Sequence, residues 1–292
     1  MDVFLLHLLN GLQLSMLIFL LAVGLTLIFG LMDMFNLAHG AFYTLGAYAG
    51  LTIFKMTGSY WIALAVAPIL PFVLGAAFQY FFLQPLVLKG RSSHLDIALF
   101  TFGFMFVTMG TIELIFGSAF STIAVPPGLE GGVQVLGITY PFYRLFIIGL
   151  GLTIAGILWL VLDHTVFGAI VRAGVDNREM VVGMGVNISL VFALVFGVGT
   201  ALAGLAGVVA APVLSIFSQM GLAVLITAFI VVIIGGLGNF KGSFYGAIIV
   251  GMVETMIQAY LPQLQLFAIY VLLAVVMFVR PQGLFGAKKQ TS

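Results

Sequence analysis

The sequence contains no cysteine and very little charge. Only 7% of its 292 residues are Asp, Glu, Lys or Arg, whereas soluble domains carry about 25% charged residues. The absence of cysteine excludes disulfides, thiolate metal sites and a cysteine nucleophile. Ten basic residues against nine acidic ones leave a net charge of +1, so there is no basic surface for nucleic-acid phosphates.

Catalytic and nucleotide-binding motifs are also missing from the sequence. Neither a GxxxxGK(S/T) phosphate loop nor a GxSxG nucleophile turn occurs, so this chain is not predicted to hydrolyse ATP itself. The histidines lie far apart and form no HExxH pattern: His7, His39, His94 and His164. We therefore predict no catalytic residue, no metal site and no bound cofactor, which disfavours an integral membrane enzyme.

Apolar runs dominate the sequence. Hydrophobic residues make up 63% of the chain, and the mean hydropathy is +1.28. The runs are about 18 to 24 residues long, which suits helices crossing a ~30 Å hydrocarbon core rather than the ~10-residue strands of a barrel. We predict an all-α polytopic membrane protein, a single transmembrane domain over residues 1–292 with about eight to ten helices. The nine predicted spans are 11–31, 37–54, 61–84, 94–116, 142–162, 189–211, 217–238, 244–261 and 264–280.

The Lys and Arg residues predict the orientation, because cytoplasmic loops carry an excess of them. With nine spans, eight of the ten cations fall on one side: Lys89, Arg91, Arg172, Arg178, Lys241, Arg280, Lys288 and Lys289. The N-terminus is then predicted outside and the C-terminus in the cytoplasm. The outer connection, residues 117–141, has no Lys or Arg and contains Pro126 and Pro127, so it is either a docking surface or a plain linker.

The inner connection, residues 164–187, mixes charged and apolar residues and predicts a short amphipathic helix at the membrane surface. Its apolar residues recur at helical spacing: Val171, Val175, Val181, Val182 and Met184. Asp176, Arg178 and Glu179 are expected to face away from lipid. The helix either binds a cytoplasmic partner or is only solvated.

Small residues are abundant, with 36 glycines in the chain. In "GVGTALAGLAGVV" they recur every three or four residues. Two sets each share one helix face: Gly197, Ala201 and Gly204, and Gly199, Ala203 and Gly207. Because small residues let helix backbones approach closely in a bilayer, we predict a tightly packed bundle.

Polar residues interrupt the apolar pattern in the stretch "DMFNLAHG". Asp33 and Asn36 favour helix N-caps, so the chain is predicted to break there and to start a new helix at Leu37. Inside the membrane such a helix start can face an anionic substrate group, whereas at the inner surface it is only a helix cap. Glu254 lies within the eighth span, where a carboxylate either faces a cavity or partner, or makes a hydrogen bond between helices.

Five segments carry a resemblance to a known family. In chain order they are "GLTLIFGLMDMFNLAHGAFYTLGAYAG", "VRAGVDNREMVVGMGVNISLV", "FGVGTALAGLAGVVAAPV", "VVIIGGLGNFKGSFYGAIIVG" and "FVRPQGLFG". The set resembles the permease subunits of high-affinity bacterial branched-chain amino acid ABC importers, almost from end to end. The first segment departs from that pattern at Leu37, where the family commonly has Phe, and this change is conservative.

The resemblance implies a permease subunit of an ATP-driven importer for branched-chain amino acids in the bacterial inner membrane. Its implied partners are a second homologous permease, two ATP-binding subunits that hold the ATP, and an extracytoplasmic substrate-binding protein. Importers of urea and short-chain amides share these motifs, so permease function for those compounds is the alternative. A secondary carrier is a further alternative.

The resemblance also assigns two groups of site residues. Those of the substrate pathway are Asn36, His39, Gly40, Tyr43 and Asn239. Those that couple the chain to the ATP-binding subunits are Arg172, Asp176, Asn177, Arg178, Glu179 and Gly185. A short rigid helix in the inner connection is expected to transmit the movement of those subunits to the spans that it joins.

Overall fold

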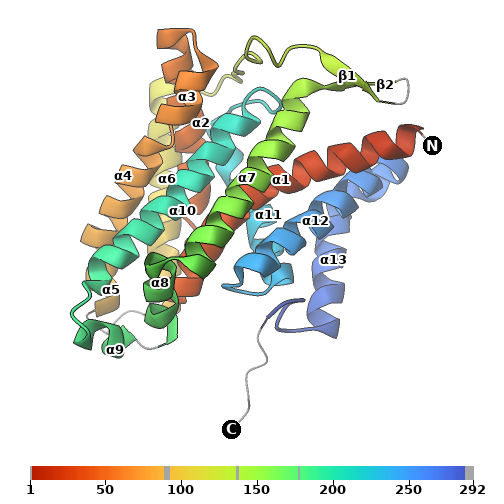
Figure 1. The fold of residues 1–292 in the computed structure, drawn as a ribbon. Coiled ribbons are helices and arrows are strands. Elements are labelled where there is room, and N and C mark those ends of the chain that lie inside the picture. The colour runs from red at the N-terminus through yellow and green to blue at the C-terminus, as the bar shows by residue number, and fades with distance from the viewer. Residues whose placement is uncertain (1, 89–92, 136–137, 177, 287–292) are drawn as a thin grey trace.

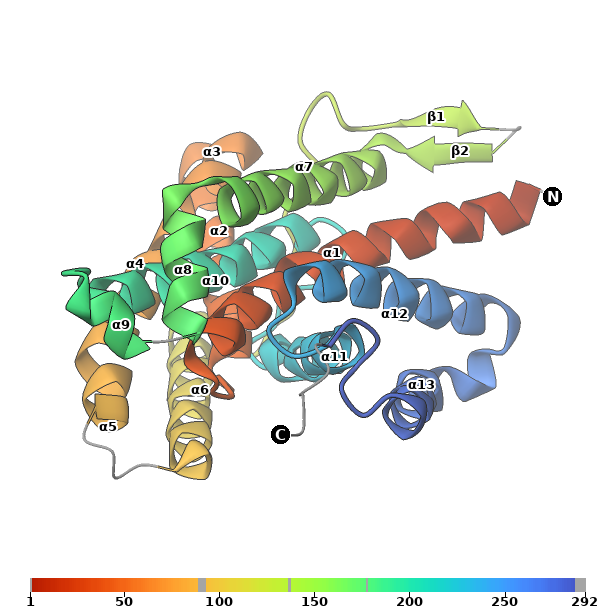
Figure 2. The same cartoon turned by 60° about the horizontal axis from the view of Figure 1, so that its bottom comes forward.

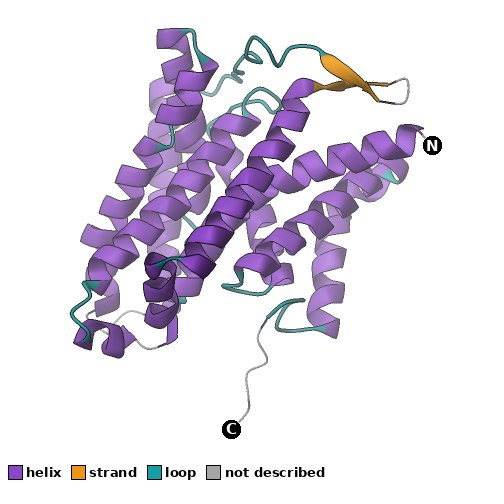
Figure 3. Ribbon diagram, in the orientation of Figure 1, coloured by secondary structure: helices purple, strands orange, loops and turns teal. Residues whose placement is uncertain are grey.

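A computed structural model describes residues 2–88, 93–135, 138–176 and 178–286 as a helical bundle (Figure 1). The helices are α1 (Asp2–Met32), α2 (His39–Thr57), α3 (Tyr60–Val66), α4 (Ile69–Phe78), α5 (Gln84–Leu88), α6 (His94–Phe116), α7 (Phe142–His164), α8 (Val166–Asp176), α9 (Arg178–Gly183), α10 (Ile188–Ala210), α11 (Met220–Gly235), α12 (Phe240–Tyr260) and α13 (Gln265–Val279). A π-helical turn, Gln79–Leu83, joins α4 to α5, and a 3-10 turn, Pro262–Leu264, precedes α13. The described strands form one hairpin, β1 (Gly132–Val135) and β2 (Ile138–Pro141) (Figure 3).

Seven helical segments among the described residues are long and apolar enough to cross a membrane. They are Val3–Met32, Tyr60–Leu86, His94–Phe116, Phe142–His164, Ile188–Ala210, Phe240–Tyr260 and Pro262–Val279. The two other predicted spans, 37–54 and 217–238, coincide with α2 and α11, which are not among the seven. Helix α11 has only 16 residues, and the hydropathy of α2 is lowered by its many small and polar residues. The chain is thus an all-α polytopic membrane protein.

Helix α10 is largely buried and packs against α1, α2 and α4. One of its faces carries Gly197 and Gly204, which contact α4. A second face carries Gly199 and Gly207, which contact α1 and α2. A Cβ at Gly199 would lie 2.8 Å from the carbonyl oxygen of Gly24 on α1, so the two helix backbones touch. The two predicted faces of small residues are therefore the contact surfaces of α10.

The two ends of the bundle differ in structure. Helices α8 and α9 lie at the lower end in Figure 1, where α7 ends and α13 ends, whereas the hairpin and the N-terminus lie at the upper end. Helix α12 runs alongside α1 (Figure 2), and Thr26 of α1 hydrogen-bonds to Ser243 near the start of α12. Arg172, Lys241 and Arg280 belong to elements of the lower end. The side of the membrane that this end faces stays a prediction.

The outer connection, residues 117–141, is structured rather than a plain linker. Its hairpin was not predicted, and β1 pairs antiparallel with β2 so that Val133 lies opposite Tyr140. Ser121 exchanges two backbone hydrogen bonds with Ile216, of 2.9 and 2.7 Å. These bonds tie the outer connection to the segment between α10 and α11. Its role as a docking surface stays a prediction.

Candidate functional site

The chain breaks between α1 and α2, as predicted, but α2 begins at His39 rather than at Leu37. Asp33 follows α1 in the left-handed backbone region, with a φ of 49°, which Asp tolerates better than most residues. Asn36 does not cap the helix. Its Oδ1 accepts a hydrogen bond of 3.1 Å from the backbone N–H of Ala38, and Ala38 occupies the N-cap position. The Asn36 side chain therefore organises the turn that leads into α2.

The start of α2 lies inside the bundle. Nε2 of His39 lies 3.0 Å from the carbonyl oxygen of Leu21 on α1. Leu21 is eleven residues before Met32, the last residue of α1, which is about 16 Å along the helix axis at about 1.5 Å per residue. Asn36 and His39 are fully buried. The start of α2 therefore lies within the bundle, while its depth in the membrane stays a prediction.

Several backbone N–H groups at this helix start have acceptors within the chain. Leu37 donates to Oγ1 of Thr101 at 3.1 Å, while Ala38 and His39 both donate to Asn36, at 3.1 and 3.4 Å. In this conformation they are not free to bind an anionic substrate group. Nδ2 of Asn36 and Nδ1 of His39 are buried without a partner among the described residues, yet neither residue lines the cavities described below. Their place in the pathway stays a prediction.

Gly40 and Asn239 have packing and capping contacts. A Cβ at Gly40 would collide with the backbone of Gly221, so this glycine lets α2 and α11 meet. Asn239 caps α12, because its Oδ1 accepts a hydrogen bond of 3.0 Å from the N–H of Gly242. Its Nδ2 donates to the carbonyl oxygen of Phe285 at 2.7 Å, which holds the C-terminal segment against the start of α12.

Tyr43 is the predicted pathway residue that lines a cavity at the centre of the chain. The cavity has a volume of about 190 Å³, and its walls come from α1, α2, α10, α11 and α12. Aliphatic side chains, including Leu17, Ile18 and Val224, form most of the wall, while Tyr43, Thr227 and Glu254 bring the polar groups. The cavity opens on the α11 side, where Ala223 is exposed.

Glu254 is half-buried at this cavity. Among the described residues that line the cavity, it is the only Asp, Glu, Lys or Arg. Neither the Glu254 carboxylate nor the Tyr43 hydroxyl has a hydrogen-bond or ion-pair partner within the described part of the chain. Of the two predicted roles of Glu254, the structure therefore supports the one in which its carboxylate faces a cavity. The predicted pathway residues did not include Glu254, although a carboxylate inside a span is itself a signal of function.

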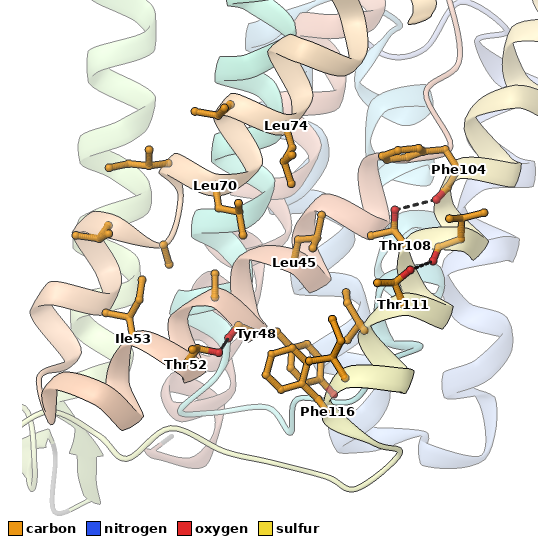
Figure 4. A pocket seen from close by; sticks show the side chains of 18 residues that line it. Leu45, Tyr48, Thr52, Ile53, Leu70, Leu74, Phe104, Thr108, Thr111 and Phe116 are labelled. Atoms are coloured by element: carbon orange, nitrogen blue, oxygen red, sulfur yellow. Dashed lines mark hydrogen bonds between the residues drawn. The ribbon is translucent and has the colours of Figure 1, made fainter. Parts of the chain in front are cut away.

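A larger groove between α2, α4 and α6 has different chemistry (Figure 4). Its volume is about 770 Å³, and its lining is almost entirely apolar. Thr52, Thr108 and Thr111 each donate to a carbonyl oxygen four residues earlier, at 2.8 Å, so their hydroxyls are already used. The ring of Tyr48 packs against that of Phe116 in a tilted arrangement, with ring centroids 4.7 Å apart. This groove suits lipid chains rather than a polar substrate.

The predicted inner amphipathic helix consists of two short helices, α8 and α9. Val171 and Val181 are buried in a small apolar cluster with Leu31 at the end of α1 and Ile188 at the start of α10. Met184 is 75% exposed, so the predicted apolar face is split between the bundle and the surface.

The turn after α9 depends on Gly185, which adopts a φ of 83° that an L-residue with a side chain rarely takes. The need for this backbone conformation is enough to explain a glycine at this position, without any contact to an ATP-binding subunit. Asn177 lies outside the described residues, and Asp176, Arg178 and Glu179 are placed by their backbone alone, at the end of α8 and the start of α9. Their contacts with ATP-binding subunits stay predictions.

Arg172 has a partner within the chain. Its guanidinium donates to the carbonyl oxygen of Leu162 near the C-terminal end of α7, where a cation is favourable. Arg172 also lines a cavity of about 500 Å³ together with Asn239, Asp163 and Lys241. Lys241 and Asp163 form a salt bridge of 3.2 Å. This polar cavity lies at the lower end, where α1, α7, α8 and the start of α12 meet.

Comparison with known proteins gives matches along nearly the whole chain. The model of the family described as branched-chain amino acid transport system / permease component matches residues 7–279. The chain is 28% identical to the high-affinity branched-chain amino acid transport system permease protein LivH of Escherichia coli (strain K12), covering 97% of this chain and 96% of that protein. It is 25% identical to the corresponding permease protein BraD of Pseudomonas aeruginosa, covering 96% and 95%. Among solved structures, PsaBC from Streptococcus pneumoniae in complex with Fab has a similar fold, with a TM-score of 0.52, 12% identity and coverage of 94% and 91%.

Proposed function

This chain belongs to the family of permease components of branched-chain amino acid transport systems, and on that premise we propose that it forms half of the membrane pathway of an ATP-driven importer for leucine, isoleucine and valine. The observation that carries the proposal is the family match over residues 7–279. The named relatives are permeases for the same cargo and are matched over almost their full lengths. ATP is hydrolysed by separate subunits.

A second, homologous permease is proposed to complete the pathway. The cavity that Tyr43 and Glu254 line opens on the α11 side, where Ala223 is exposed. A polar cargo cannot cross beside a wall that is open to lipid, because each unsatisfied polar group in hydrocarbon costs several kcal/mol. A partner permease seated on that side supplies the missing wall and explains why one chain holds only part of the route.

The proposed coupling element is α8 with α9, which contacts the two ATP-binding subunits at the cytoplasmic end. Val171 and Val181 anchor these helices on the end of α1 and the start of α10. Helices α1 and α10 also carry walls of the central cavity, through Leu17 and Ala206. A push on α8 therefore has a continuous packed route to the cavity. Exposed apolar side chains such as Met184 provide contact surface for the subunit that pushes.

The upper end is proposed to face outside and to receive an extracytoplasmic substrate-binding protein. The outer connection has no Lys or Arg, and its hairpin and the Ser121–Ile216 bonds give it a fixed shape. A fixed surface loses less conformational entropy when a partner docks.

Transport by purified proteins in vesicles tests the proposal. The complete complex, loaded with ATP, should accumulate leucine only when the binding protein is present, and the binding protein with leucine should stimulate ATP hydrolysis. The chain alone should accumulate nothing under an ion gradient. Accumulation by the chain alone would establish a secondary carrier instead. Uptake of urea or acetamide, with no uptake of leucine, would replace the proposed cargo by the alternative one.

A further inference from the structure

The carboxylate of Glu254 is chemically unusual for its place in the chain. It lies within α12, one of the helices long and apolar enough to cross a membrane. A charge in such a position is costly unless it has a partner, and ionisable residues there usually serve substrates, ions or proton transfer. Within the described residues Glu254 has no cationic neighbour and no hydrogen-bond donor. The described part of the chain therefore leaves this carboxylate available to a bound group.

We propose that Glu254 binds the ammonium group of the cargo amino acid in the central cavity. The Tyr43 hydroxyl is then placed to donate a hydrogen bond to the carboxylate of the cargo. The inference rests on the proposed function and names the cargo-binding residues for it. An ammonium group donates hydrogen bonds and carries a full positive charge, which a carboxylate accepts and balances. Neither urea nor a neutral amide carries that charge.

The rest of the cavity wall fits the remaining part of such a cargo. Leu17 and Ile18 of α1 and Val224 of α11 present aliphatic surface. A branched aliphatic side chain removed from water against this wall gains the hydrophobic contribution that a polar side chain lacks. The cavity thus presents one acceptor, one hydroxyl donor and an aliphatic wall, which together match an aliphatic zwitterion. Thr227 directs its O–H group to the carbonyl oxygen of Ala223 at 3.5 Å, so it is not counted as a donor to the cargo.

The absence of cysteine from the chain allows a direct test of binding. Ala223→Cys places a single thiol of this chain in the lining of the cavity, on the side where the partner permease is proposed to sit, and the complete complex is reconstituted in nanodiscs without the binding protein. Labelling by N-ethylmaleimide is followed on this chain after separation of the subunits. The probes are leucine, 3-methylbutylamine, which keeps the ammonium group, and 4-methylpentanoate, which keeps only the carboxylate.

The proposal expects leucine and 3-methylbutylamine to slow labelling, and 4-methylpentanoate to leave it unchanged. Glu254→Gln should raise the half-protective leucine concentration about tenfold or more, because a charge-assisted contact is lost. Glu254→Asp should restore part of the protection. The matched control is Glu113→Gln on α6, which makes the same chemical change outside the cavity and should leave protection unchanged.

Several outcomes would overturn the inference. One is equal protection by leucine in the Glu254→Gln and unsubstituted complexes, and another is equal protection by 4-methylpentanoate and leucine. If Glu254→Gln does not assemble, the comparison of the amine with the acid on the Ala223→Cys complex decides the matter alone. A complex that transports leucine in vesicles but shows no protection refutes this inference only, whereas a complex that transports no amino acid refutes the proposed function.

Discussion

The contact between Gly46 on α2 and Gly204 on α10 gives the sharpest prediction for the packing of the bundle. A Cβ at Gly46 would lie 2.5 Å from the carbonyl carbon of Gly204 and closer still to neighbouring backbone atoms. The far side of Gly204 is closed as well, because a Cβ there would lie 2.5 Å from the Pro71 ring of α4. Backbone on one side and a rigid proline ring on the other leave no flexible side chain to move, so Gly46→Ala must separate two helices.

The magnitude follows from two opposing effects. Overpacking a well-packed interior costs about 1–3 kcal/mol, and direct contact with the Gly204 backbone, itself held against the Pro71 ring, places Gly46→Ala at the upper end of that range. Alanine is favoured over glycine in a helix by about 1 kcal/mol, which offsets part of the cost. A net loss of about 2 kcal/mol is expected. At about 2 °C per kcal/mol for a chain of this size, the melting temperature should fall by about 4 °C.

Thermal unfolding in detergent, followed by the loss of the monodisperse peak on size exclusion, measures this effect. The matched control is Gly110→Ala on α6, since a Cβ there meets no atom within 4 Å. That variant gains only the helix preference and should be unchanged or stabilised by up to about 1 kcal/mol. Equal melting temperatures for the two variants would refute the close contact of α2 with α10.

Three further predictions concern the lower end. Asn239→Ala removes the cap of α12 and the bond to the Phe285 carbonyl, so stability should fall by about 1–2 kcal/mol and limited proteolysis near the C-terminus should quicken; unchanged proteolysis would contradict the tie. Arg178→Glu should reduce co-purification of the ATP-binding subunits while the melting temperature stays constant, and full recovery of those subunits would remove Arg178 from the contact. Lys241→Ala breaks a bridge to Asp163 between side chains that are 62% and 37% exposed, so stability should change by less than about 1 kcal/mol in a melting experiment.

The sequence predicted the parts of the fold that depend on local pattern. Long apolar runs reveal membrane helices because a bilayer requires about 20 apolar residues per helix. The faces of α10 were predictable because three- and four-residue spacings put Gly197 with Gly204 and Gly199 with Gly207. The break near Asn36 was predictable from the preference of Asp and Asn for caps and turns. Each of these features is set within one helical segment.

The features that sequence could not place depend on contacts between distant segments. The depth of α2 is set by His39 against Leu21 and by the packing of Gly40 on Gly221, and no local pattern states where along α1 the chain returns. The hairpin lies in a stretch of only a few alternating residues. Which valines of the inner connection reach the cluster around Leu31 depends likewise on the packing of distant segments.

The site residues show the same division more sharply. Asn36 and Glu254 are both polar residues in apolar surroundings, so their sequence contexts mark them equally as candidates. In the structure the side-chain and backbone carbonyl oxygens of Asn36 accept hydrogen bonds from Ala38 and His39. The acceptor atoms of Asn36 therefore serve the turn. The Glu254 carboxylate makes no hydrogen bond or ion pair with the described residues, so its oxygens remain available to a bound group. The buried Nδ2 of Asn36 and Nδ1 of His39 also lack partners, but neither residue lines a described cavity, whereas Glu254 does. The combination of a free carboxylate and a cavity is what supports the proposed cargo site, and it exists only once the neighbours are in place.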